Sequence, residues 1–443
     1  MRSKRTLFVA LAAVAVAGAM ALPASVAGAS SPSKLWVNSS AVPVGGTGTS
    51  CAAPGYTSIQ AAINNAGNFG ATINVCTGTY VEQLTIVHSV KLVGTGGPVT
   101  VQLPAAPVSN GTICDNALAD VNNVGQPGED AVSICGAGAV SITGITVSAF
   151  FPAGDCYDSL YGVLVGNGTT LTAKGLTVNG AGVPIGDGAV GCQGGVAIQI
   201  GSARGSGQVG HATLTNTVVT GYQKAGIVAS GAGTTMSVKT ATVTGRGPVN
   251  TAENGIEVAF GALGTINGAS VSNNVCSNVN CGPDSMVDYQ ASGVMFYGAA
   301  PGSGIKRSTL TNNDMGIYYG SSAASEPVTP EVTIAHNTIT SSVDEGIYLD
   351  QGRASLSHDV INGTGPVGIQ IGQYNGQTYA PASSASHESI SGQGIGVQVY
   401  SDNAVSGDLA GNFSISHSKF LHTNTTALTN NSANFTTSGT GNS

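Results

Sequence analysis

The sequence predicts an all-β fold, a single right-handed parallel β-helix (a solenoid) with a short N-terminal capping helix. Two phrases recur along the chain, and the 65 glycines leave little helical periodicity. The second phrase, hydroxyl–apolar–hydroxyl, lies between copies of the first and is typified by Thr338-Ile339-Thr340. A fixed unit that recurs at uneven intervals, because insertions of variable length separate its copies, is typical of a solenoid. The first phrase is a glycine followed by alternating apolar residues, and its copies begin at Gly162, Gly195, Gly226, Gly255, Gly293, Gly316, Gly346, Gly368 and Gly396.

Both phrases alternate with period two, which predicts strands with one buried face. In Gly346-Ile347-Tyr348-Leu349, for example, Ile347 should point inward and Tyr348 outward. One coil cannot bury its apolar residues alone, so the coils must stack. Asparagine pairs such as Asn273-Asn274 and Asn312-Asn313 mark sharp corners that need positive φ.

The N-terminus has the pattern of a secretory signal. Arg2, Lys4 and Arg5 precede an apolar run over 7–22, and small residues over 27–29 supply a cleavage site. We expect a signal peptide over 1–29, a linker over 30–50, the β-helix over 51–425 and a disordered polar tail over 426–443. The predicted location is extracellular, by secretion and without a membrane anchor.

Charge and cysteine content agree with export. The predicted signal holds three of the 14 Lys and Arg, so the mature chain carries 11 against 22 Asp and Glu, a formal charge of −11. So acidic a chain is a poor partner for nucleic acid. An even number of cysteines in an exported protein favours disulfides. The sequence contains no C-x-x-C pair, the spacing that would instead indicate a metal site. We predict pairing between neighbours in sequence: Cys51–Cys76, Cys114–Cys135, Cys156–Cys192 and Cys276–Cys281.

The first coils carry the one helical pattern and a resemblance. Ser58 is an N-cap candidate for a helix over 59–63, which would cover the open end of the solenoid. The phrases that follow, over 73–82 and 89–94, resemble the opening coils of the pectin-lyase-like superfamily, particularly pectinesterases and right-handed β-helix repeat proteins. The detailed match covers about 56–96, and a looser one continues to about 422. In this resemblance Glu82 has a structural role.

The resemblance implies polysaccharide-acting proteins, but their catalytic phrases are missing here. The segment over 156–161 lacks the glutamine of a pectinesterase, and Gly210-His211 is only a fragment of a polygalacturonase phrase. The mature chain has only four arginines. If the protein is an enzyme, the resemblance implies a polysaccharide lyase or glycoside hydrolase, on a scaffold that also suits an esterase.

Stacking the glycine-led strands gives two outward columns, the first running through Ala197, Glu257 and Met295. Tyrosines offer a sugar both an apolar face and a hydroxyl. The substrate-binding candidates are Tyr297, Tyr318, Tyr348, Tyr400 and Gln370. The candidates for acid and base, or alternatively for one calcium ligand set, are Asp350, Glu257 and Glu345. No other cofactor is expected. The alternative is that these tyrosine, glutamine and acidic side chains belong to an ordinary exposed β-sheet, whose surface has the same composition.

Three functions remain open. The first is a secreted, monomeric protein that binds or modifies an extracellular polysaccharide. The second is a non-catalytic solenoid for adhesion or envelope structure. The third is ice binding through T-x-T strands, because a hydroxyl column runs through Thr217, Thr309 and Thr338 before Asp359 interrupts it.

Overall fold

The computed structural model describes one compact unit within residues 32–443. The described ranges are 34–67, 70–108, 110, 114, 129–136, 138–151, 160–182, 194–203, 208–277, 281, 291–320, 331–350, 353–363, 365–373, 382–401, 411–421, 426–430 and 435–443. The predicted signal peptide lies outside the described residues. No helix within these ranges is long and apolar enough to span a membrane.

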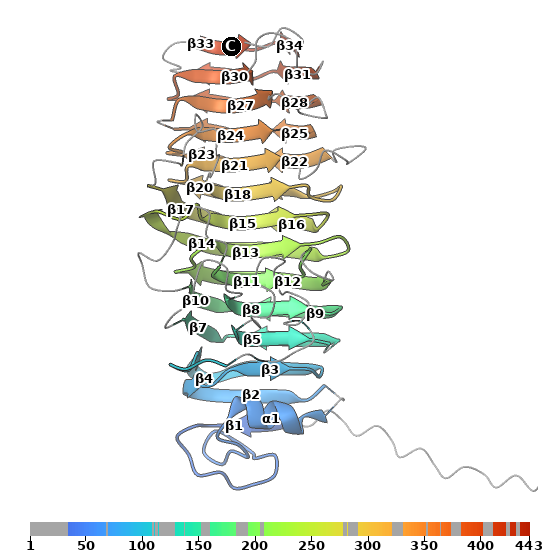
Figure 1. Ribbon diagram of the computed structural model, residues 1–443, viewed down its shortest axis with the longest axis vertical. Coiled ribbons are helices and arrows are strands. Elements are labelled where there is room, and N and C mark those ends of the chain that lie inside the picture. The colour runs from blue at the N-terminus through green and yellow to red at the C-terminus, as the bar shows by residue number, and fades with distance from the viewer. Residues whose placement is uncertain are drawn as a thin grey trace, which may run out of the picture. The chain divides into compact units, whose positions relative to one another are not determined.

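The strands stack coil upon coil along one axis (Figure 1), and each pairs in parallel with its neighbours in the coils below and above. One face, here called the front sheet, is a ladder of 12 described strands. Its members are β3 (Leu84–Ile86), β5 (Glu129–Cys135), β8 (Leu160–Gly166), β11 (Val196–Ile200), β13 (Ala225–Ser230), β15 (Asn254–Ala259), β18 (Ser292–Tyr297), β21 (Met315–Gly320), β24 (Glu345–Asp350), β27 (Val367–Gln373), β30 (Ile395–Ser401) and β33 (Thr426–Asn430).

The remaining 22 described strands form a second sheet that folds into two ladders. The first ladder comprises β1 (Lys34–Val37), β2 (Thr72–Val81), β4 (Val90–Gln102), β6 (Ala139–Thr143), β9 (Thr169–Lys174), β12 (Gly210–Thr220), β14 (Thr235–Val249), β16 (Leu263–Asn267), β19 (Gly304–Lys306), β22 (Glu331–Ala335), β25 (Arg353–Ser357), β28 (Ala382–Ser386), β31 (Gly411–Ser416) and β34 (Phe435–Thr440). The second ladder adds β7 (Thr146–Phe150), β10 (Thr177–Gly182), β17 (Ser270–Cys276), β20 (Thr309–Thr311), β23 (Thr338–Thr340), β26 (Val360–Asn362), β29 (Ser389–Ser391) and β32 (Lys419–Leu421).

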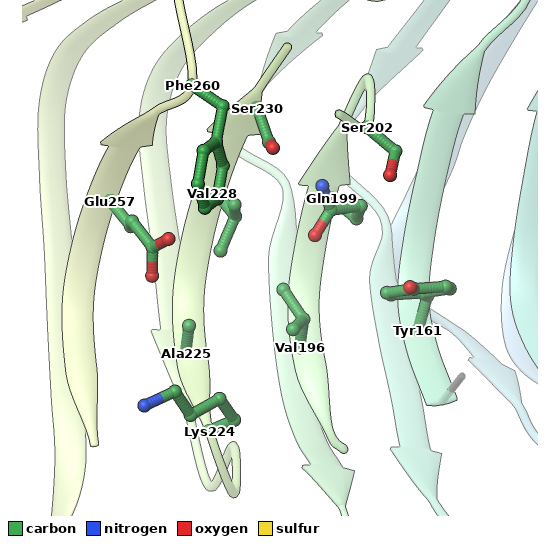
Figure 2. A pocket seen from close by; sticks show the side chains of 10 residues that line it. All are labelled: Tyr161, Val196, Gln199, Ser202, Lys224, Ala225, Val228, Ser230, Glu257 and Phe260. Atoms are coloured by element: carbon green, nitrogen blue, oxygen red, sulfur yellow. The ribbon is translucent and has the colours of Figure 1, made fainter. Parts of the chain in front are cut away.

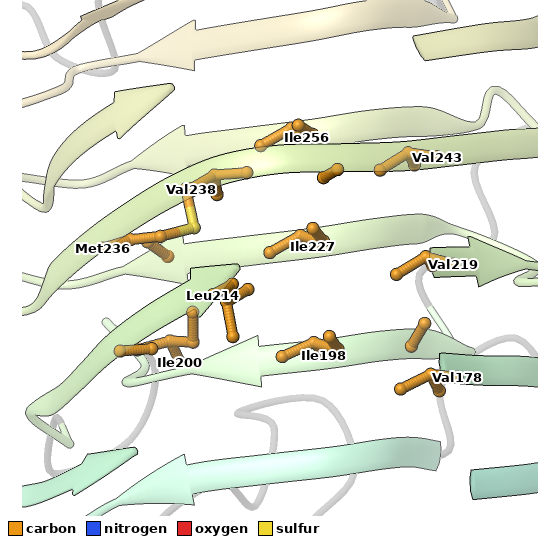
Figure 3. Close-up of a cluster of buried hydrophobic side chains, with 14 of the residues drawn as sticks. Val178, Ile198, Ile200, Leu214, Val219, Ile227, Met236, Val238, Val243 and Ile256 are labelled. Atoms are coloured by element: carbon orange, nitrogen blue, oxygen red, sulfur yellow. The ribbon is translucent and has the colours of Figure 1, made fainter. Parts of the chain in front are cut away.

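The core is a set of apolar columns that run through the stack. Ile198, Ile227 and Ile256 lie opposite one another on successive front strands, and all three are fully buried. Figure 3 shows them facing valines such as Val219 and Val243 from the second sheet. The predicted inward position of Ile347 is confirmed, because this side chain is fully buried. Each column buries what no single coil could bury alone.

The corner that precedes each strand of the second ladder turns through a residue with positive φ. Gly144, Gly175, Asn216 and Gly268 occupy this corner in early coils, with φ between 51° and 70°. The backbone N–H of Gly268 donates to the carbonyl of Lys306 in the next coil. We call this position the left-handed corner.

The N-terminal helix is confirmed as α1 (Ile59–Asn65), and its buried residues include Ile59 and Ile63. Ser58 caps it by accepting from the backbone N–H of Ala61. Glu82 accepts from the backbone N–H groups of Ile59 at 2.8 Å and Gln60 at 3.0 Å. This confirms the structural role of Glu82, since its carboxylate satisfies N–H groups that a helix start leaves unpaired.

Three of the four predicted disulfides are confirmed: Cys51–Cys76, Cys114–Cys135 and Cys276–Cys281. The fourth predicted pair, Cys156–Cys192, lies outside the described residues. Disulfides are typical of oxidising compartments, which agrees with a location outside the cytoplasm.

Two predicted boundaries differ from the structure. Strand β1 lies inside the expected linker, where it pairs with β2 and buries Leu35 and Val37. Strands β33 and β34 lie in the expected disordered tail and pair with β30 and β31. The tail is polar, but the pairing of a terminal coil uses backbone groups, which polar residues supply as well as apolar ones.

Candidate functional site

The candidate residues meet on the outward side of the front sheet. Glu257, Met295, Tyr318 and Tyr348 lie opposite one another on β15, β18, β21 and β24, followed by Gln370 on β27. A parallel column two residues further along contains Tyr297, Asp350 and Tyr400. The two columns together are called the strip. Its membership is as predicted, because parallel strands in register keep residues of one phase on one face.

The upper part of the strip is tightly packed. The Tyr318 hydroxyl donates to the Asp350 carboxylate at 3.1 Å, and its ring meets that of Tyr348 edge-on at 5.5 Å between centroids. Tyr348 occupies an outward register position, yet its side chain is only 4% exposed. Gln370 is similarly covered. Tyr318, which is half-buried, is therefore more accessible than Tyr348.

Tyr297 lies between the two candidate carboxylates. Burial, then the negative charges of Asp350 and Glu257, raises the pKa of the Tyr297 hydroxyl. Phe260 meets the ring of Tyr297 edge-on at 5.5 Å and is 42% exposed. The half-buried Tyr297 ring and the exposed Phe260 ring thus form an accessible aromatic pair beside Glu257.

Glu257 is held in place by a short polar chain. The Nδ2 of Asn254 donates to the Glu257 carboxylate at 3.3 Å and also contacts the sulfur of Met295. The Ser292 hydroxyl donates to Oδ1 of Asn254 at 2.9 Å, which fixes the orientation of that amide. Asn254 and Ser292 are both buried, so the carboxylate is oriented from beneath.

A pocket of about 80 Å³ continues the strip toward the N-terminus (Figure 2). Glu257 of the strip and the neighbouring Phe260 both line the pocket. Lys224 lies at its edge and donates from Nζ to the carbonyl of Ala252 at 2.9 Å. The lining residues are Tyr161, Val196, Gln199, Ser202, Lys224, Ala225, Val228, Ser230, Glu257 and Phe260.

Several of these residues were missed from the sequence. The first column was expected to pass through Ala197, but the structure places Gln199 there, opposite Leu164 and Val228. Ala197 is fully buried. In this coil Ala197 occupies the position that the repeat glycine takes in the next coil, so Gly195 lies two residues too early in the chain to be the repeat glycine. Phe260 was missed because it lies at a corner with φ of 53°, outside the alternating phrase.

The predicted catalytic carboxylates do not form a close pair. Glu257 on β15 and Asp350 on β24 are three strands apart, which separates their backbones by about 14 Å at the usual strand spacing. Carboxyl groups that hydrolyse glycosides are roughly 5 to 9.5 Å apart. Glu345 is only 1% exposed, so it cannot reach a polymer on the surface. Among the described residues, no group of three His, Cys, Asp or Glu is arranged to hold a metal ion.

The hydroxyl column of the second ladder is less regular than expected. The structure places Val218 opposite Thr177 and Val360 opposite Thr338, whereas Thr217 and Asp359 are buried. Two valines therefore interrupt the column. Flat, unbroken T-x-T geometry is limited to short stretches such as the pair formed by Thr311 and Thr340, whose hydroxyls are 3.1 Å apart.

Comparisons with solved structures identify similar folds at low sequence identity. The complex structure of XylC with xylose gives a TM-score of 0.57 at 11% identity, over 91% of this chain and 86% of that one. The catalytic domain of a GH87 alpha-1,3-glucanase in complex with nigerose gives 0.56 at 14%, over 94% and 69%. The periplasmic alginate epimerase AlgG gives 0.52 at 11%, over 84% and 77%. At these identities the likeness concerns the fold alone.

A search of the curated proteins finds no match. A family model described as a right handed beta helix region matches residues 130–385, more than half of the chain. This match confirms the predicted handedness and agrees with the parallel stack of coils. The chain belongs to the right-handed beta helix family.

Proposed function

We propose that this protein is secreted and binds a linear extracellular polysaccharide along the strip, with one end of the polymer in the adjoining pocket. The observation that carries the proposal is the accessible pair of Phe260 and Tyr297 beside the Glu257 carboxylate. Aromatic rings pack against the apolar faces of sugar rings, and carboxylates accept hydrogen bonds from sugar hydroxyls.

The shape of the face suits an extended ligand. The strip runs from β15 to β30, five steps of strand spacing, or about 24 Å. A linear polymer can contact this shallow surface along its length. The structural neighbours include an alginate epimerase, a complex with xylose and a glucanase in complex with nigerose, which supports a carbohydrate as the ligand class.

The arrangement favours binding over hydrolysis. Glu257 and Asp350 are too far apart for the usual pair of carboxyl groups, and Asp350 already accepts from the Tyr318 hydroxyl. We therefore assign both carboxylates to ligand recognition. Lyase and esterase activities are tested by measuring unsaturated products and released esters.

The binding experiment compares the parent with the double variant Phe260→Ala/Tyr297→Ala. Alginate, xylan and α-1,3-glucan serve as probes in isothermal titration or affinity electrophoresis. Each ring lost should weaken binding by about 0.5 to 1.5 kcal/mol, so the double variant should bind roughly five- to 150-fold less tightly. The matched control is Phe150→Ala, because Phe150 is an exposed phenylalanine, 57% exposed, on the second sheet.

Equal binding by the parent and the double variant would show that the strip is only exposed sheet. Failure of the parent to bind any probe would favour the alternative of a structural or adhesive solenoid. Incubation of the parent with each probe, followed by measurement of reducing ends, unsaturated products and released esters, tests for catalysis separately. Thermal unfolding of each variant checks that the fold is retained.

A further inference from the structure

Four exposed histidines stack on one another in successive coils of the second sheet. They are His336, His358, His387 and His417, and each occupies the left-handed corner with φ between 53° and 59°. Successive ring centroids are 4.8, 4.6 and 5.2 Å apart, and successive rings are within 18° of parallel. We call this column the histidine ladder.

The backbone sets the spacing of the histidine ladder. The N–H of His336 donates to the carbonyl of Ser357, that of His358 to Ser386, and that of His387 to Ser416. Each histidine is thus tied to the coil above it, so the imidazoles repeat at the interval of one coil.

Positive φ alone does not require histidine at this corner. Glycine occupies it at Gly144, Gly175 and Gly268, and asparagine at Asn216, with the same backbone conformation. These residues satisfy the steric requirement at least as well. The presence of histidine at this corner in four successive coils therefore requires an explanation other than backbone conformation.

The exposed groups at the corners of the histidine ladder carry positive charge or none. Arg307 occupies the same corner one coil earlier, Lys306 precedes it, and Lys419 lies at the other end; all three are exposed. The two carboxyls at these corners, Asp359 and Glu388, are buried, and burial raises the pKa of each. The flanking strand residues in the histidine coils are Ala335, Ser357, Ser386, Ser416, Thr338, Val360 and Ser389.

The nearest exposed carboxylate on the strands that lead to the ladder already faces a cation. Glu331 begins β22, five positions before His336, and lies opposite Arg353, which begins β25. Both side chains are exposed, at the ends of their strands that are distant from the histidines. The pair therefore adds no net charge beside the rings.

A groove of about 410 Å³ lies beside the start of the ladder. Lys239 and Lys306 belong to its lining, and no Asp or Glu is among the described lining residues. Gly304 also lines the groove, where an added Cβ would collide with the Thr333 carbonyl of the next coil. The groove and the histidine ladder therefore form a continuous surface without an exposed carboxylate among its described members.

The stacking also argues against a metal site. Two ligands of one ion must converge on it, whereas parallel rings nearly 5 Å apart present their nitrogens in parallel directions. What parallel rings present instead is a row of N–H donors at a regular interval. Imidazoles gain positive charge as pH falls through the range from about 8 to 5.

We propose that the histidine ladder, together with Arg307 and the lysine-lined groove, binds a linear anionic polysaccharide more tightly at mildly acidic pH. Protonated rings this close repel one another, and a polyanion laid along them relieves that repulsion. Binding and protonation therefore favour each other by linkage. The surface lies on the second sheet, so the inference does not depend on the strip of the front sheet.

The test uses the quadruple variant His336→Asn/His358→Asn/His387→Asn/His417→Asn. Asparagine keeps the corner conformation, as Asn216 shows. Binding to alginate is measured at about pH 5.5 and about pH 7.5 at one ionic strength, with neutral dextran as the uncharged probe. Four exposed ion pairs, at a few tenths of a kcal/mol or more each, predict that the parent binds alginate at least about tenfold more tightly at the lower pH. The quadruple variant should lose this increase.

Two controls separate this surface from the strip. His211→Asn changes a histidine outside the ladder, which contacts Thr235, and should keep the increase. Phe260→Ala/Tyr297→Ala should lower binding by the same factor at both pH values if the strip binds alginate, and leave the pH-dependent increase unchanged. An increase that persists in the quadruple variant, or an equal increase with dextran, overturns the proposal. So does a parent whose affinity for alginate is the same at both pH values.

Discussion

Glu388 provides a pH-dependent test of the internal packing. Its side chain is 1% exposed, Oε2 accepts from the N–H of Asp359 at 3.0 Å, and Oε1 has no hydrogen-bond partner among the described residues. Burial, and then the negative charge of Asp359, raises the pKa of Glu388 from 4.5 to about 9. The protonated form is therefore the stable form in the folded chain.

The sign of the effect on stability follows from this raised pKa. As pH rises above about 4.5, the unfolded chain releases the Glu388 proton while the folded chain keeps it, so the free energy of unfolding falls until the pH passes about 9. Each pH unit in this window costs about 1.4 kcal/mol. Between about pH 5 and pH 8, Glu388 alone removes up to about 4 kcal/mol of stability. Burial also raises the pKa of Asp359, to about 7, so both buried carboxyls lower the stability as the pH rises.

Glu388→Gln removes the ionisable group and keeps an oxygen that can accept from the Asp359 N–H. We expect the variant to be more stable than the parent at about pH 8 by several kcal/mol, and closer to it at about pH 5. Urea unfolding at both pH values, with hydrogen exchange of the last coils, measures the difference. Glu331→Gln is the control because Glu331 is exposed on β22. Parallel curves of stability against pH for the parent and Glu388→Gln would refute the reasoning.

Three further predictions concern the fold. Val219→Thr should lower the free energy of unfolding by about 1 to 3 kcal/mol, because it buries a hydroxyl without a partner. Val218→Thr, on the outward side of the same strand, should change the free energy of unfolding by less than about 0.5 kcal/mol. Equal urea midpoints for the two variants would contradict the assigned faces. Replacing both Cys51 and Cys76 by alanine should cost about 3.5 kcal/mol at a separation of 25 residues, and an unchanged unfolding free energy would oppose this estimate. The chain produced by export into an oxidising compartment and then denatured should show no thiol that reacts with maleimide. Two reactive thiols would contradict the predicted Cys156–Cys192 pair.

The candidate strip shows how far a repeat pattern reaches. Glu257, Tyr318 and Asp350 were placed on one face from the sequence, because parallel strands in register carry the alternation from coil to coil. Where the coil length varies, the residue predicted for a column differs by one or two positions from the residue that occupies it. Gln199 instead of Ala197 and Val218 instead of Thr217 are both such register errors.

Burial could not be read from the alternation. Tyr348 has the outward phase but is covered, while Phe260 at a corner is exposed beside Tyr297. Whether an outward side chain reaches solvent depends on the size and orientation of its neighbours in the coils above and below. These neighbours are a whole coil away in sequence, and loops between the strands set which of them meet.

The sequence by itself determined the parallel β-helix, the capping helix and three confirmed disulfides, because each depends on local spacing or on a pattern repeated in every coil. Only the tertiary structure decided which outward residues form an accessible site. It also revealed the histidine ladder, since the rings of His336, His358, His387 and His417 are evenly spaced although their positions in the chain are not. Stacking converts unequal sequence intervals into one spatial interval, through hydrogen bonds between coils that sequence distance does not encode.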